Sequence, residues 1–290
     1  MKHLKLKIYS ISLFLLFITS SCSQASSEIF TISDDITFRM IYVKGGNFNM
    51  GCTNEQSSDC FEDEIPAHNV ILSDYYIGEI EVTQGLWYSV MGTTIEQQGA
   101  KMLEEYNVKA EAPLYGAESS NPMYYINYLE CQEFCNQLNN LLKDKLPTGY
   151  KFTIPTEAQW EYAARGGNKS KHTKYSGSDN LYEVAWNMDN SGFITRTCGL
   201  KSPNELGIYD MSGNLFEWCL DYYDESYYNT SSATIKDPKN LIESSTQTRV
   251  MRGGSWGAGG GLCRISYRNS HTIPEDRNPF LGFRLVLCKQ

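Results

Sequence analysis

The chain is poor in histidine and in positive charge. Its 290 residues include four histidines, and 25 lysines and arginines stand against 34 aspartates and glutamates. No basic stripe interrupts this acidic balance, so nucleic acid is not an expected partner. Beyond the first 21 residues the sequence also lacks any apolar run long enough to span a bilayer. What remains is typical of an acidic globular protein rich in aromatic residues.

The N-terminus has the features of a targeting segment. Three lysines among the first seven residues precede an apolar stretch at residues 8–18, which is too short for a membrane-spanning helix. The following Ile18-Thr-Ser-Ser-Cys22 resembles a bacterial lipobox, in which Cys22 becomes the lipidated first residue. We therefore predict a lipoprotein signal peptide over residues 1–21 and a lipid-anchored protein of the bacterial cell envelope, facing the periplasm or the cell surface. An ordinary signal peptide cleaved near Ala25 is the alternative.

Eight further cysteines follow Cys22, and an exported protein is expected to form disulfides. Cys52 and Cys60 bracket a short polar loop and are a candidate local pair. Zinc is less expected, because no histidine lies near Cys131 and Cys135, which are spaced i,i+4 on a predicted helix. The disulfide candidates are Cys52, Cys60, Cys131, Cys135, Cys219, Cys263 and Cys288.

Local patterns predict a mixture of strands, short helices and long loops. The polar segment 22–36 is interpreted as a tether, so that the main domain covers residues 37–290. Thr83, Asn127 and the capping box Thr156-Glu-Ala-Gln159 each predict the start of a helix. The predicted strands are residues 38–50, 69–72, 75–82, 249–252, 262–268 and 282–288, with irregular loops at 93–120 and over most of 166–248.

Six blocks of residues occur in order between residues 40 and 286. They are Met40-Ile-Tyr-Val-Lys-Gly45-Gly46, Asp63-Glu64-Ile-Pro66-Ala-His68, Glu79-Ile-Glu81-Val82-Thr83-Gln84, Ile154-Pro155-Thr156-Glu157-Ala158-Gln159-Trp160-Glu161, Tyr209-Asp210-Met-Ser-Gly213-Asn214-Leu-Phe-Glu217-Trp218, and Arg252-Gly253-Gly254-Ser255-Trp256 with Leu281-Gly-Phe-Arg284. Together they resemble the formylglycine-generating enzyme family, also called the sulfatase-modifying factor domain. The resemblance implies an α+β, C-type-lectin-like fold with a small twisted antiparallel sheet, two helices and extensive ordered coil.

Enzymes of that family oxidise a sulfatase cysteine to formylglycine and need two cysteines, five residues apart, that bind copper(I). Alignment on Arg264 and Arg268 places Gly260 and Ile265 at the two cysteine positions. Neither residue binds copper, and Cys263 alone supplies one sulfur where two are needed. The sequence therefore predicts no catalytic cysteine pair, and copper is not an expected cofactor.

The resemblance also implies disulfides at the closing strands. In the family fold the segment after Glu217-Trp218 runs near those strands, which favours a bond between Cys219 and Cys263. Family members link the last strand to the first helix, so Cys288 would bond to Cys135 or, one turn earlier, to Cys131.

A calcium site is implied at the loop Asp210-Met-Ser-Gly213-Asn214-Leu215-Phe-Glu217. Matching the family's positions gives the side chains of Asp210 and Glu217 with the carbonyl groups of Gly213 and Leu215. Oxygen ligands of this kind suit Ca²⁺. The alternative is a solvated acidic turn in which Asn214 caps the backbone.

The function predicted from these features is that of a membrane-anchored, non-catalytic module. It would bind a peptide or glycan ligand, or assist assembly in the cell envelope. One alternative is a formylglycine-generating oxidase with an unusual cysteine arrangement. Another is a calcium-dependent carbohydrate-binding module, which rests on analogy between folds alone.

Overall fold

A computed structural model describes residues 27–33, 36–243 and 246–290 of the chain. The predicted signal peptide and the lipidation residue Cys22 lie outside these described residues. Within them, no helix is long and apolar enough to cross a bilayer.

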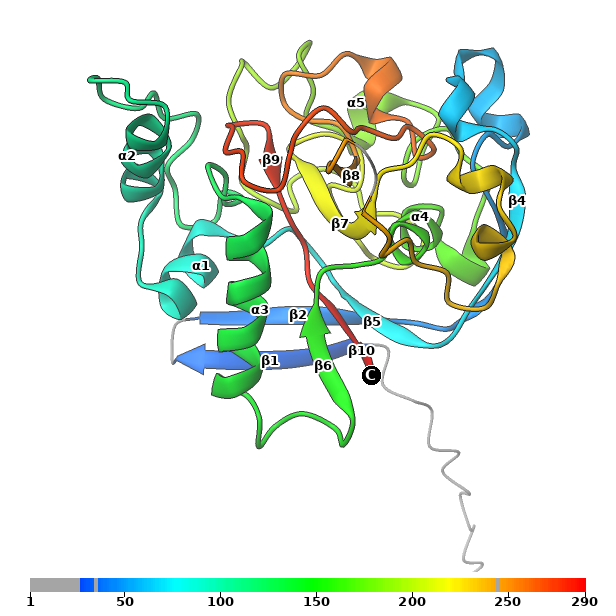
Figure 1. Cartoon of the computed structure of the whole chain (residues 1–290), viewed down its shortest axis with the longest axis horizontal. Coiled ribbons are helices and arrows are strands. Elements are labelled where there is room, and N and C mark those ends of the chain that lie inside the picture. Colours follow the sequence, from blue (N-terminus) through cyan, green and yellow to red (C-terminus); the bar gives the residue numbers. More distant parts are fainter. Residues whose placement is uncertain (1–26, 34–35, 244–245) are drawn as a thin grey trace, which may run out of the picture.

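An antiparallel sheet of five strands, in the order β1-β2-β5-β10-β6, lies along one side of the molecule (Figure 1). A two-stranded hairpin, β3-β4, and a three-stranded sheet, β8-β7-β9, complete the strands. The strands are β1 (Ser27–Ser33), β2 (Ile36–Val43), β3 (Gly46–Met50), β4 (His68–Leu72), β5 (Tyr75–Gly78), β6 (Tyr150–Thr153), β7 (Phe216–Tyr222), β8 (Arg249–Arg252), β9 (Leu281–Gly282) and β10 (Val286–Lys289).

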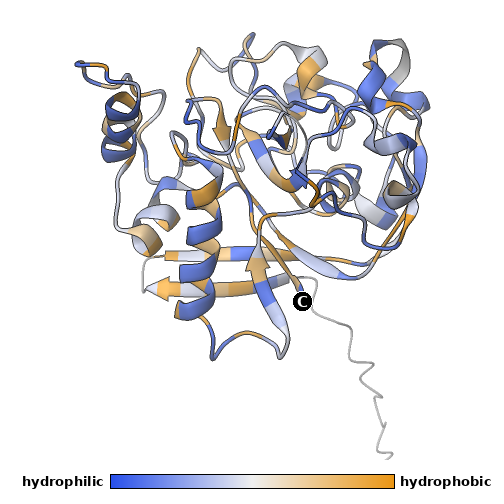
Figure 2. Cartoon of the chain, viewed as in Figure 1, coloured by the Kyte–Doolittle hydropathy of each residue, from blue (hydrophilic) through white to orange (hydrophobic). Residues whose placement is uncertain are grey.

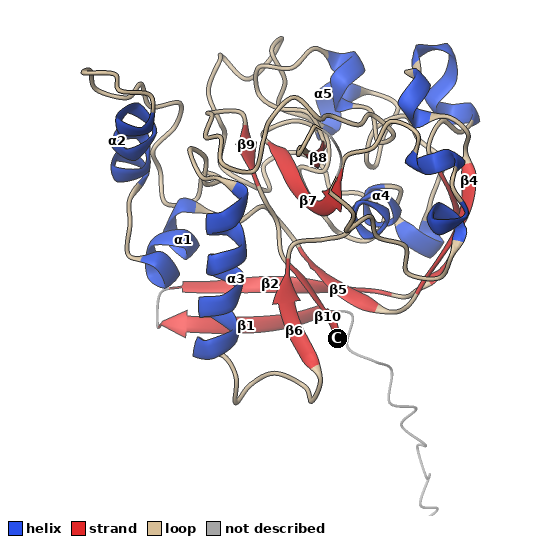
Figure 3. Ribbon diagram, in the orientation of Figure 1, coloured by secondary structure: helices blue, strands red, loops and turns tan. Residues whose placement is uncertain are grey.

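Five α-helices are described, and α3 crosses the five-stranded sheet beside α1 (Figure 1). The helices are α1 (Gln84–Met91), α2 (Ile95–Glu105), α3 (Tyr128–Leu141), α4 (Glu157–Ala164) and α5 (Leu181–Val184). Side chains cap the first turns as the sequence predicts: Thr83 accepts a hydrogen bond at α1, Asn127 at α3 and Thr156 at α4. The rest of the chain is mostly loop, as Figure 3 shows.

The sequence prediction of two helices and one small sheet needs correction. Residues 95–105 form α2 rather than loop, because Thr94 and Gln97 make a capping box that polar composition had concealed. The pairing of β7 with β9 is parallel, so the strands are not all antiparallel. Residues 262–268 do not form a strand, since a 3₁₀ turn at Gly260–Cys263 leads into coil.

The predicted tether over residues 22–36 is wrong for residues 27–33. These residues form β1, which pairs with β2 in antiparallel register. Phe30 of β1 is buried and stacks against Phe38, with ring centroids 5.4 Å apart. The apolar positions of Ile29, Phe30 and Ile32 were the signal for a strand that the polar residues around them outweighed.

Aromatic side chains join the helices to the sheets. Trp87 of α1 stacks on Phe134 of α3 with ring centroids 5.5 Å apart, and Trp218 of β7 meets Tyr128 edge to face at 5.7 Å. Both tryptophans are fully buried. Figure 2 shows the same distribution, with apolar residues alternating along the sheet and on one stripe of α3.

The loops are held by buried arginine–glutamate pairs rather than by regular structure. Arg264 donates two hydrogen bonds to Glu64, at 2.8 and 2.6 Å, and both side chains are fully buried. Arg268 pairs with Glu157 at 2.7 Å, and Arg252 pairs with Glu161. Each pair connects the C-terminal segment to an element more than 90 residues earlier in the chain.

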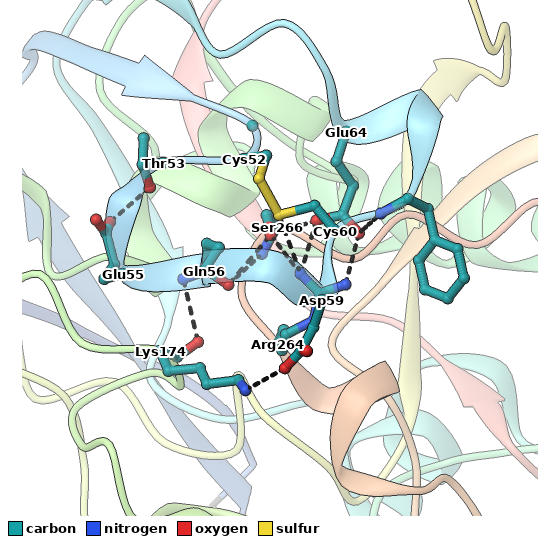
Figure 4. The surroundings of a disulfide bond; sticks show 12 residues. Cys52, Thr53, Glu55, Gln56, Asp59, Cys60, Glu64, Lys174, Arg264 and Ser266 are labelled. Carbon is teal, nitrogen blue, oxygen red and sulfur yellow. Dashed lines mark hydrogen bonds and ion pairs between the residues drawn. A yellow bond between two sulfur atoms is a disulfide. The ribbon is translucent and has the colours of Figure 1, made fainter.

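The disulfide prediction is confirmed for one pair. Cys52 and Cys60 are bonded, and their loop lies against Arg264, Glu64 and Ser266 (Figure 4). The pairs implied by the family, Cys219 to Cys263 and Cys288 to a cysteine of α3, are not formed. Six cysteines are free thiols in the described part of the chain: Cys131, Cys135, Cys198, Cys219, Cys263 and Cys288. Cys219 and Cys263 belong to different apolar clusters.

Replacing Glu64 by Gln should destabilise the protein by about 3–5 kcal/mol, because a buried guanidinium loses its counter-charge. The control is Glu79→Gln, which removes a pair with Arg39 whose side chains are 46% and 30% exposed. That change should cost about 0–1 kcal/mol. Urea unfolding of both variants measures the difference. Equal losses would contradict a structural role for the buried pair.

Candidate functional site

A groove of about 370 Å³ lies beside the C-terminal segment. Its lining is mostly apolar and includes amide, hydroxyl and imidazole groups, which is the composition of many ligand pockets. The lining residues are Phe216, Met251, Ser255, Gly257, Ala258, Leu262, Asn269, His271, Thr272, Asn278, Phe280 and Leu281.

A pair of glycines shapes the wall behind this groove. Gly253 and Gly254 have φ of +99° and +80°, a conformation that favours glycine. A Cβ on Gly254 would lie 2.6 Å from the sulfur of Cys263, so the turn at Gly260–Cys263 packs there only because a side chain is missing. Cys263 is therefore fully buried, and burial raises the pKa of its thiol to about 12.

The two positions matched to the family's cysteines do not supply reactive groups. Gly260 begins the 3₁₀ turn, and Ile265 is 1% exposed in the core. Cys263, the thiol between them, faces Gly254 in the interior. A thiolate is the reactive form of cysteine, so a buried thiol with a raised pKa does not suit the family's oxidation chemistry.

The loop predicted to bind calcium lies next to a buried salt bridge. Glu217, on β7, accepts hydrogen bonds from Arg284 at 2.6 and 2.7 Å and from the indole of Trp160 at 2.7 Å. Both carboxylate oxygens of Glu217 are therefore engaged. Asp210 differs, because its Oδ2 accepts from the backbone N–H of Gly199 while its Oδ1 is buried without a partner.

Two residues that the sequence did not single out as ligands converge on Asp210. They are Glu81, in the loop between β5 and α1, and Cys198, in the long loop before β7. The ligand atoms of Glu81, Cys198 and Asp210 all lie within 4.8 Å of one another. The thiol of Cys198 donates to Glu81 at 3.2 Å. Glu81 also accepts from the side chain of Asn214 and from the backbone of Leu215.

Electrostatics in this cluster favour protonation. Burial, with the nearby charges of Asp210 and Glu217, raises the pKa of Glu81 well above its ordinary value. Burial raises the pKa of Asp210 to about 6, although the Gly199 N–H opposes the shift. Burial and the two carboxylates likewise raise the pKa of Cys198. Burial is the largest cause of each shift, so the neutral forms of these groups are favoured unless a cation compensates their charge.

The predicted calcium ligands fit this arrangement in part. Asp210 has an oxygen without a partner, as a ligand would need. Glu217 is already paired with a guanidinium, which weakens its attraction for a second cation. Calcium at Asp210, Gly213, Leu215 and Glu217 stays a prediction.

A comparison with known protein families supports the resemblance that the six sequence blocks indicate. The sulfatase-modifying factor enzyme 1-like domain matches residues 29–289. The chain belongs to this family.

Three proteins show how this sulfatase-modifying factor domain compares with relatives. Chaperone protein LppX of Paenibacillus barcinonensis is 31% identical and aligns over 93% of this chain and 94% of its own length. A formylglycine-generating enzyme of Streptomyces coelicolor is 34% identical over 149 residues, which is 45% of each protein. The solved structure of Treponema denticola variable protein 1 has a TM-score of 0.72 at 28% identity, covering 92% of this chain and 100% of that one.

Sequence reasoning missed the cluster around Asp210 for a clear reason. Glu81 belongs to one of the sequence blocks, two residues before the cap residue Thr83, but nothing local indicates which loop it faces. Cys198 is 117 positions away from Glu81. A contact of that separation has no signature in a single sequence.

Native Cys263 should resist alkylation by iodoacetamide because its thiol is buried and its pKa is about 12. We expect it to react at least roughly tenfold more slowly than partly exposed Cys288, and both to react in denaturant. Mass spectrometry of tryptic peptides measures the two rates. Comparable native rates would show that this thiol is accessible after all.

Proposed function

We propose that this protein is a non-catalytic, lipid-anchored binding module that holds extended polypeptide segments of envelope proteins in the groove beside β8 and β9. The observation that carries the proposal is the combination of an open, largely apolar groove with a buried Cys263. The groove offers space and apolar surface for a ligand, and it lacks the exposed sulfur pair that the family's oxidation reaction would need.

The groove suits part of a polypeptide better than a whole small molecule. Phe216, Met251, Leu262 and Phe280 offer an apolar floor for one or two side chains. Four further lining residues offer donors and acceptors that an extended backbone needs when it leaves water: Asn269, His271, Thr272 and Asn278. A mixed lining of this kind supports binding of many sequences rather than one.

The relative LppX supports the same direction, since its name describes a chaperone protein and the alignment spans nearly the full length of both chains. A chaperone function needs exposed apolar surface and no chemistry, and Phe280 keeps 39% of its surface exposed within the groove. The lipid anchor at Cys22 would place this surface at the membrane, where exported chains emerge.

The full-length protein in nanodiscs should slow the aggregation of reduced insulin, measured by light scattering against empty nanodiscs. Phe280→Ser should remove most of the effect, since hydrophobic contact with the client is lost. The matched control is Phe193→Ser, because Phe193 is 62% exposed and is not among the groove residues. Unfolding temperatures of both variants show whether the fold is kept.

Two other outcomes would replace this proposal. Formation of an aldehyde on a Cys-x-Pro-x-Arg peptide in the presence of copper(I) would establish an oxidase. Calcium-dependent binding to a glycan array, with no effect on insulin aggregation, would establish a carbohydrate-binding module. Equal activity of the Phe280→Ser and Phe193→Ser proteins would place client binding outside the groove.

Replacing Cys22 by Ala should release the protein from the membrane fraction into the soluble fraction. A lipoprotein carries several acyl chains, and their loss removes anchoring that one chain alone supplies only marginally. Immunoblotting of the two fractions measures the shift. Full retention of the Cys22→Ala protein in the membrane would contradict lipidation at this residue.

A further inference from the structure

We propose that Glu81, Cys198 and Asp210 form a binding site for a thiophilic divalent cation, with Zn²⁺ as the natural occupant. Glu81 comes from one loop, and Cys198 and Asp210 come from another; the ligand atoms of the three residues all lie within 4.8 Å of one another. Zinc with one sulfur and two oxygen ligands has bond lengths of about 2.0–2.3 Å, so its ligand atoms lie roughly 3.5 Å apart. A contraction of roughly 1 Å would close the site around the ion.

An unsatisfied oxygen points to a missing partner in this cluster. Asp210 is 2% exposed, and its Oδ1 is buried with no hydrogen bond. Buried polar atoms nearly always have a partner, and an unpartnered one calls for an explanation. The other carboxylate oxygen of Asp210 is held by the Gly199 N–H at 2.6 Å, which fixes the direction of the side chain.

The second carboxylate is oriented in the same way. Glu81 accepts from the side chain of Asn214 at 2.9 Å and from the backbone N–H of Leu215 at 3.1 Å. Hydrogen bonds that hold ligand side chains in place are a regular feature of metal sites. Oε1 of Glu81 keeps a free lone pair, while Oε2 accepts from Asn214 and from the Cys198 thiol and would gain one when that thiol loses its proton.

When its carboxylates are ionised, the cluster carries more negative than positive charge. Glu81, Asp210 and Glu217 are three buried carboxylates, and Arg284 is the guanidinium that faces them. Arg284 is already committed to Glu217 by two hydrogen bonds. The ammonium of Lys201 also acts on Asp210, but it donates to the Tyr182 carbonyl and lies 4.0 Å from the centre of the Trp186 ring.

The thiol selects the class of ion. Calcium takes oxygen ligands, whereas zinc and related ions bind thiolate sulfur strongly. Binding would release the Cys198 thiol proton, now directed to Glu81, to solvent and leave a thiolate–metal bond; any carboxyl proton would leave with it. Cys198 is partly exposed, so water can complete a tetrahedral shell. This set shares Asp210 with the predicted calcium site but does not use Glu217.

Such an ion would join segments that otherwise have little regular structure. Glu81 lies between β5 and α1, while Cys198 and Asp210 lie in the loop that leads from α5 to β7. An ion binding all three would therefore stabilise this long loop against the five-stranded sheet. Because only the native state brings the ligands together, binding would raise the unfolding temperature.

The test uses the full-length protein, stripped of metal with a chelator and titrated with Co²⁺ as a spectroscopic substitute for Zn²⁺. One equivalent of Co²⁺ should produce a near-ultraviolet sulfur-to-metal charge-transfer band, which one equivalent of Zn²⁺ should abolish. Cys198→Ser should lose this band and weaken Zn²⁺ binding by at least roughly 100-fold. Cys288→Ser, which removes another partly exposed thiol, should keep both properties.

Circular dichroism of the metal-free proteins tests whether Cys198→Ser still folds. Asp210→Asn provides a second ligand variant with the same expected loss. Absence of a charge-transfer band in the wild type would overturn the proposal, as would its persistence in Cys198→Ser. Stabilisation by Ca²⁺ with no response to Zn²⁺ would also overturn it and favour the oxygen-only set of Asp210, Gly213, Leu215 and Glu217.

Discussion

The pairing of buried arginines with buried glutamates is the interaction on which the rest of the structure depends. Arg252, Arg264, Arg268 and Arg284 all come from the last 40 residues, and each is held by a glutamate from an earlier element. Buried charges are costly unless each has a well-oriented partner, so loss of either partner of a pair would destabilise the fold. They set the position of the C-terminal segment, and through it the groove, the buried Cys263 and the turn that carries Asp210.

Much of the local structure could be predicted because its causes are local. The capping residues Thr83, Asn127 and Thr156 lie where the helices begin, and the strand at residues 249–252 has the predicted bounds. The helix α2 and the strand β1 were missed because their apolar residues are few and their stability depends on packing against distant elements. The family-implied disulfides failed for a similar reason, since the partners of Cys219 and Cys288 depend on loop paths that no local pattern records.

The candidate sites also differ in whether local sequence or long-range packing determines them. The absence of a cysteine pair near Arg264 and Arg268 was readable from the sequence, whereas the burial of Cys263 depends on the close approach that Gly254 allows. The cluster of Glu81, Cys198 and Asp210 could not be predicted from the sequence, because loops joined by ionic contacts bring together residues far apart in the chain. The lack of a cysteine pair is therefore a property of the sequence. The cluster of Glu81, Cys198 and Asp210 is a property of how the loops fold.

The early start of β1 limits how the domain can sit at a membrane. Ser27 is already part of the sheet, and five residues of extended chain span at most about 18 Å. A lipid at Cys22 would therefore hold the N-terminal end of this edge strand within that distance of the headgroups. In Figure 1, β8 and β9 lie on the opposite side of the molecule from β1 and β2. The dimensions of the domain itself would then set the distance between β8 and β9 and the lipid surface.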